Sequence, residues 1–128
     1  MTVDQKTILS LSPSPDALRL REATLRRGGL TVVSVENGIQ ARFEIEMGRC
    51  GVFLLCYRSS VQNADDLTSL FRKFCPEGWI IFIKDPAKKA TVPREVDIVV
   101  SESSGPELIL DLLTRRMNAP PSAPPRAA

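Results

Sequence analysis

The chain has 128 residues, of which 43% are hydrophobic and 25% are charged, and its formal net charge at pH 7 is +2. This composition supports one compact domain with its own core, and the near-neutral charge argues against a nucleic-acid binder or a membrane-surface protein. The sequence contains no histidine, which excludes a Ser-His-Asp or Cys-His triad within this chain and removes the commonest metal ligand.

The three cysteines are Cys50, Cys56 and Cys75. An odd number without a CxxC pair argues against both a zinc site and a disulfide framework. We expect free thiols in a reducing cytoplasm. The N-terminal segment lacks the apolar core of a signal peptide, and no stretch approaches the length of a membrane span, so we expect a cytoplasmic protein without a membrane partner.

Strand and helix signals alternate from the start of the chain. The apolar run at Thr7–Leu11 predicts a strand. Ser14 and Pro15 then suit the N-cap and first position of a helix that ends at Gly28. The β-branched run at Leu30–Val35 predicts the second strand.

A second helix follows Asn37 as its N-cap and carries Ile39, Phe43 and Met47 at the four-residue spacing of an apolar helix face. The next segment, Gly51–Tyr57, is apolar without interruption. Such a run is typical of a strand buried on both faces of a parallel sheet.

A third helix is expected from Asn63, followed by a fourth apolar strand at Trp79–Ile83. The segment Lys84–Glu95 is polar and contains Pro86 and Pro93. Proline interrupts a helix, so any helix there is limited to one or two turns.

The fifth strand is predicted at Val96–Val100 and the last helix at Glu107–Met117, opened by Pro106. We expect residues 1–117 to form the domain and the Pro/Ala-rich segment 118–128 to be a disordered tail. Five strands alternating with helices predict an α/β fold, with a parallel sheet covered on both faces and a ligand crevice at the carboxyl ends of the strands.

The order and spacing of these elements, from about Lys6 to Met117, resemble the receiver domain of response regulators. The segments that carry the resemblance are TILSLS, ENGIQARFEI, CGVFLLCY, WIIFIKD and VDIVVSESSGPELILDLL. The resemblance implies a flavodoxin-like doubly wound sheet of five parallel strands, here with a fourth helix that is short or eroded.

At each position where receivers carry out phosphotransfer, this sequence departs from the family pattern. Ser12 and Pro13 replace the acidic pair, Cys56 the acceptor aspartate, Lys84 the Thr or Ser, and Ser101 the lysine. Mg²⁺ needs charged oxygen ligands, and an acyl phosphate needs a carboxylate nucleophile. The resemblance therefore implies a pseudo-receiver with no catalytic residue, metal or cofactor, and not an enzyme.

From a receiver-like fold that lacks the phosphorylation site, we expect a protein-binding module in a two-component phosphorelay. Its partner would be a histidine kinase, a response regulator, another signalling domain or a second copy of the chain. Leu108, Leu112 and Leu113 make the last helix apolar over more than one face, so we expect a contact surface there.

The alternative hypothesis is a small redox or ligand sensor that uses the vacated pocket around Ser12, Cys56, Lys84 and Ser101. A thiol near a lysine can have a lowered pKa and react with oxidants. A buried, inert thiol is the commoner role of such a cysteine. Lys84 either takes the place of the missing metal or points into solvent, and exposed lysine is the commoner case.

The first helix carries a cluster of arginines: Arg19, Arg21, Arg26 and Arg27. Such a cluster can meet a phosphate or an acidic partner. Because Glu22 lies among these arginines and no aromatic residues accompany them, we expect a solvated helix face instead.

Overall fold

The computed structural model describes residues 7–56, 61–87 and 91–118. Its strands are β1 Thr7–Leu11, β2 Thr31–Val35, β3 Val52–Cys56, β4 Trp79–Lys84 and β5 Ile98–Ser101. Its helices are α1 Pro15–Arg27, α2 Gly38–Met47, α3 Val61–Phe74 and α4 Pro106–Asn118, with a 3₁₀ turn, η1, at Glu102–Ser104. No helix in the described part of the chain is long and apolar enough to cross a bilayer. The tail predicted to be disordered lies outside the described residues from position 119 onward.

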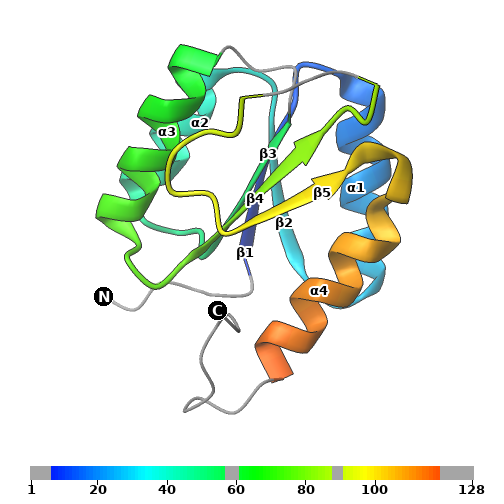
Figure 1. Cartoon of the computed structure of the whole chain (residues 1–128). Helices are drawn as coiled ribbons and strands as arrows, with labels where there is room; N and C mark the ends of the chain where they lie inside the picture. Colours follow the sequence, from blue (N-terminus) through cyan, green and yellow to red (C-terminus); the bar gives the residue numbers. More distant parts are fainter. Residues whose placement is uncertain (1–6, 57–60, 88–90, 119–128) are drawn as a thin grey trace.

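The five strands form one parallel sheet in the order β2-β1-β3-β4-β5. Helices α1 and α4 lie on one face of this sheet and α2 and α3 on the other (Figure 1). The strand order reverses between β1 and β3, which places the crevice of a doubly wound sheet at the carboxyl ends of these two strands. The flavodoxin-like architecture predicted from the sequence is thus confirmed.

Two apolar cores, one on each face, hold the layers together. Successive side chains of a strand point to opposite faces, so β3 gives Phe53 to the core under α2 and α3 and Leu54 to the core under α1 and α4. The residues that the helices contribute include Phe71 from α3 and Ile109 from α4. Burial on both sides explains why β3 and β4 read as uninterrupted apolar runs.

The helix starts follow the capping residues that the sequence offers. The Ser14 hydroxyl accepts a hydrogen bond from the Ala17 N–H at 3.3 Å, and the Asn37 amide oxygen accepts one from the Gln40 N–H at 2.9 Å. Helix α3 begins at Val61, two residues before the predicted Asn63.

The apolar face predicted for α2 is not the face that packs on the sheet. Ile39, Phe43 and Met47 are 84%, 57% and 50% exposed, whereas Ala41 and Ile45 are buried in the core. The helix lies on the sheet through these two smaller side chains. The three larger ones form an exposed stripe, the α2 stripe, along its outer side.

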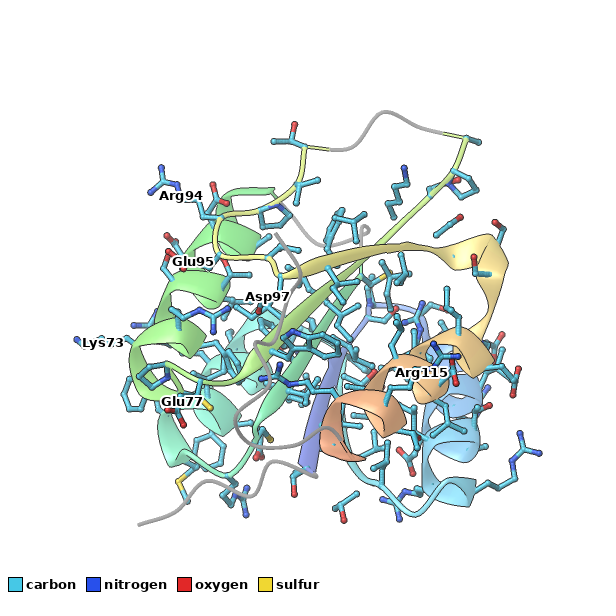
Figure 2. The ribbon with its side chains drawn as sticks, turned by 60° about the horizontal axis from the view of Figure 1, so that its bottom comes forward. Lys73, Glu77, Arg94, Glu95, Asp97 and Arg115 are labelled. Atoms are coloured by element: carbon cyan, nitrogen blue, oxygen red, sulfur yellow. The ribbon has the colours of Figure 1, made fainter. Side chains whose placement is uncertain are left out.

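The connection from β4 to β5 takes the course that its prolines predict. In the described residues 85–87 and 91–97 it forms turns and no helix. Figure 2 shows Glu95 and Asp97 of this connection lying beside α3.

Arg72 of α3 holds the connection in place. Its guanidinium donates to the carbonyls of Gly78 at 2.7 Å and Glu95 at 3.0 Å and to the Asp97 carboxylate at 2.7 Å. The same Asp97 carboxylate accepts the N–H of Ile80 in β4 at 2.9 Å. This Arg72–Asp97 clamp joins α3 to the beginnings of β4 and β5. Because the Asp97 side chain is used in this way, β5 begins at Ile98 and not at the predicted Val96.

Candidate functional site

The carboxyl ends of β1 and β3 carry Ser12, Pro13 and Cys56. Ser12 is buried, its hydroxyl accepts the Ser14 N–H at 3.2 Å, and its own N–H donates to the Val35 carbonyl at 3.2 Å. Pro13 is exposed. Cys56 is only 1% exposed. Ser12 therefore shapes the turn into α1, and the Cys56 thiol is part of the packed interior.

The ends of β4 and β5 bring Lys84 and Ser101 into register as neighbours. The Lys84 side chain is exposed, which favours the solvated alternative for this residue over a charge that replaces a metal. The Ser101 hydroxyl accepts the Ser103 N–H at 3.3 Å and so caps η1. The structure thus places Ser12, Cys56, Lys84 and Ser101 at one edge of the sheet. Each of them has its own local role.

All three cysteines are buried, and none of them forms a disulfide. Burial raises the pKa of the Cys75 thiol above its usual range, and this effect outweighs the hydrogen bond from Gly78 and the charge of Arg72. A buried thiol with a raised pKa is a poor nucleophile, and we interpret Cys75 as a core residue.

A cavity of about 340 Å³ opens beside this edge, on the face covered by α1 and α4. It is bounded by the first turns of α1, the ends of β4 and β5, η1 and the first turn of α4. Of the positions predicted from the sequence, only Ser101 is among its lining residues, and Ser12, Cys56 and Lys84 are not. The hollow is therefore displaced from the pocket that the sequence suggested.

Arg21 is the lining residue that sequence reasoning misjudged. It is only 5% exposed, whereas the arginine cluster of α1 was predicted to form a solvated face. The error has a physical reason, since Arg21 lies three residues after Leu18 and four before Leu25, both of which are buried. The helical spacing of its apolar neighbours was the signal that could have revealed its position.

Similarity to solved structures identifies the fold, although no family model and no curated protein matches the chain. The receiver domain of the sensor histidine kinase PA1611 from Pseudomonas aeruginosa PAO1 aligns with a TM-score of 0.76 at 21% identity, over 91% of this chain and 100% of that one. The BeF3-activated receiver domain of DrrB aligns with a TM-score of 0.71 at 15% identity, over 91% and 100%. The chemotaxis protein CheY4 of Vibrio cholerae aligns with a TM-score of 0.69 at 14% identity, over 88% and 98%.

The chain has the receiver fold. This fold explains why the predicted positions meet at one edge, since they follow four strands of one parallel sheet. The short or eroded helix expected between β4 and β5 is not present in the described residues 85–87 and 91–97. The Arg72–Asp97 clamp holds this connection instead.

Ser12, Pro13 and Cys56, the positions that the sequence aligns with the acidic pair and the acceptor aspartate of receivers, do not fit Mg²⁺. The Ser12 oxygen is already hydrogen bonded, Pro13 offers no side-chain ligand, and Cys56 presents a soft, buried sulfur to a cation that prefers charged oxygens. Over the described ranges 7–56, 61–87 and 91–118, no group of three or more His, Cys, Asp or Glu residues is placed to hold a metal ion. The four residues that follow Cys56, Tyr-Arg-Ser-Ser, add no carboxylate.

The contact face predicted on the last helix needs correction. Leu113 is fully buried in the core with Ile109, and Leu112 packs partly against the same core. Leu108 is 37% exposed. Leu113 cannot reach a partner because α4 uses that side to cover the sheet, so Leu108 is the most accessible of the three predicted leucines.

Proposed function

We propose that this chain is a receiver-fold signalling module that binds a protein partner in a two-component phosphorelay and is not itself phosphorylated. The observation that carries the proposal is the absence of a carboxylate from Ser12, Pro13 and Cys56, where the receiver fold holds Mg²⁺ and the phosphoryl group. We also propose that it is not an enzyme. The three buried cysteines, none of them in a disulfide, fit a reducing compartment.

The chemistry of phosphoryl transfer supports the loss of phosphorylation. The acceptor must be a carboxylate that attacks phosphorus, and a cation must neutralise the charge on the phosphoryl oxygens. The receiver domain of PA1611 was solved with magnesium in its active-site cleft. In this chain the acceptor position is the buried Cys56, and Lys84 is directed to solvent.

The exposed apolar side chains support a binding role. Ile39, Phe43 and Met47 of the α2 stripe lie in water along one helix, and Leu108 is exposed separately on α4, across the sheet. Apolar surface like the α2 stripe often marks a protein contact. A histidine kinase, another regulator or a second copy of the chain are the partners that fit the signalling context.

The phosphorylation half of the proposal is tested with the purified chain, Mg²⁺ and acetyl phosphate. Intact-mass spectrometry should show no phosphoryl adduct, and an amide NMR spectrum should not change on addition of beryllofluoride. A receiver that retains its aspartates, treated in parallel, should respond in both assays. A phosphoryl adduct on this chain, or beryllofluoride shifts at the ends of β1 and β3, would overturn the proposal.

The binding half is tested with two surface variants, Phe43→Glu on α2 and Leu108→Lys on α4. Both residues are exposed, at 57% and 37%, so both variants should fold, which circular dichroism checks. A histidine kinase or regulator that co-purifies with the parent chain and is lost with one variant locates the contact on that helix. Light scattering of the purified protein detects self-association in the same series. If no signalling protein co-purifies and the chain is monomeric, the binding role is refuted.

A further inference from the structure

Arg21 lines the cavity beside α1 and has a buried guanidinium nitrogen without a hydrogen-bond partner among the described residues. Arg21 is 5% exposed, and its Nη1 has no hydrogen-bond partner among the residues that the structure describes. The neighbouring acids on α1 are engaged elsewhere, since Asp16 pairs with Arg19 and Glu22 pairs with Arg26 at 3.1 Å. A buried charge without a counterion is costly, so a protein that retains one needs a compensating reason.

A second unpartnered group lines the same cavity. One carboxylate oxygen of Glu102, Oε2, is buried and has no hydrogen-bond partner in the described structure. Arg21 and Glu102 form no ion pair with each other within the described residues. Two residues that line the cavity, Arg21 on α1 and Glu102 on η1, thus each carry a buried polar atom without a hydrogen-bond partner in the described structure.

The surroundings of the two groups are suited to a carboxylate. The first turns of α1 and α4, two helices of 13 residues each, both border the cavity through residues such as Ala17 and Pro106. Helix N-termini carry partial positive charge, which favours an anion. Figure 1 shows these two helices side by side on one face of the sheet.

The remaining walls are largely apolar and include Leu20, Ile83 and Ile109. The volume of about 340 Å³ lies at the small end of the range for ligand pockets. A ligand that pairs with Arg21 and Glu102 and also contacts the apolar walls therefore has an anionic end, a cationic or donor end and a small apolar body.

We propose that this cavity binds a free α-amino acid with an apolar side chain. Arg21 binds the ligand carboxylate, Glu102 accepts from the ligand ammonium, and Leu20, Ile83 and Ile109 surround the side chain. The inference goes beyond the signalling role proposed above and does not depend on it. A receiver-fold chain with this site would respond to a metabolite in place of a phosphoryl group.

The test is an amide NMR titration of the full chain with L-leucine, L-isoleucine, L-methionine and L-phenylalanine at millimolar concentration. At least one of them should shift the amides of the first turn of α1 and of residues 101–106. Two half-ligands serve as controls, 4-methylpentanoate without the amine and 3-methylbutylamine without the carboxylate. Each should bind at least about ten-fold more weakly than leucine, the loss expected when one charged hydrogen bond is removed.

Two variants separate recognition from structure. Arg21→Met should abolish binding and raise the melting temperature, because it removes a buried, unpaired charge and keeps the apolar stem. Glu102→Gln should weaken the binding of leucine by about ten-fold or more. It should leave the binding of 4-methylpentanoate nearly unchanged.

Three outcomes would overturn the proposal. In the first, none of the four amino acids shifts the amides at the cavity. In the second, 4-methylpentanoate binds as tightly as leucine, which removes the role of Glu102. In the third, Arg21→Met lowers the melting temperature or fails to fold, which makes Arg21 a structural residue. None of these outcomes bears on whether the chain is phosphorylated or binds a protein partner.

Discussion

Removing the guanidinium of Arg72 should destabilise the fold more than removing any exposed arginine. Besides its bonds to Gly78, Glu95 and Asp97, this group donates to the Pro76 carbonyl at 3.1 Å. In Arg72→Met the apolar stem remains and all four hydrogen bonds are lost. The Asp97 side chain is only 9% exposed. In the variant its carboxylate loses the bond to Arg72 and keeps the bond from the Ile80 N–H.

The size of the effect follows from burial. Removing one partner of a fully buried pair costs about 3–5 kcal/mol, because the other charge is left without compensation. The Arg72 side chain is 23% exposed, so water partly replaces the lost contacts. We therefore expect a loss of about 2–4 kcal/mol in the free energy of unfolding. For a domain of this size, that corresponds to a fall of roughly 8–15 °C in melting temperature.

The assay is urea unfolding followed by the fluorescence of Trp79, the single tryptophan, which lies buried at the start of β4. Arg94→Met is the matched control. The Arg94 side chain is 78% exposed and approaches Asp65 only to 4.0 Å, so its loss should change stability by less than about 0.5 kcal/mol. Hydrogen exchange should accelerate most at the start of β5 in the Arg72 variant.

The reasoning fails if Arg72→Met costs less than about 1 kcal/mol, the contribution of a single ordinary hydrogen bond. It also fails if Arg94→Met costs as much. Either result would mean that the connection between β4 and β5 is held by its apolar contacts and not by the clamp.

Three further predictions concern the packed interior. Gly78→Ala should destabilise the fold by about 1–3 kcal/mol in urea unfolding, because the added Cβ would lie 2.7 Å from Phe71 and 2.9 Å from the Gly51 carbonyl oxygen. The three buried thiols should stay unlabelled by iodoacetamide in the native protein and react in urea, and rapid native labelling of any one would contradict its burial. Burial raises the pKa of Cys75, so the unfolded thiol ionises first and stability should fall from about pH 8.5 upward. Cys75→Ala should reduce this fall, and an unchanged pH profile would contradict the assignment.

Much of the fold could be predicted because its signals are local. Strand β1 was predicted at both ends, and the caps Ser14 and Asn37 located the starts of α1 and α2. The prolines after β4 predicted at most one or two helical turns, and the described residues 85–87 and 91–97 form turns and no helix. Two boundaries differ from the prediction by two residues, the start of α3 and the start of β5, and the Asp97 side chain before β5 bonds to Arg72 and Ile80.

The burial of individual side chains was predicted less well. The apolar spacing of Ile39, Phe43 and Met47 is that of a core face, yet α2 packs through Ala41 and Ile45. Leu108 and Leu113 are both leucines of α4, yet Leu108 is exposed and Leu113 is fully buried. Each helix has more apolar residues than one face needs, so the partner element selects the face.

The sequence by itself determined the element order, the apolar runs of β3 and β4 and the absence of a carboxylate from Ser12, Pro13 and Cys56, since these depend only on which residues occupy which positions. The tertiary structure decided that Arg21 and Glu102 line one cavity, that Arg72 reaches Asp97 25 residues away, and where the cavity opens. These features arise where helices and strands distant in the sequence pack together. Burial and charge pairing belong to that packing and not to any one segment.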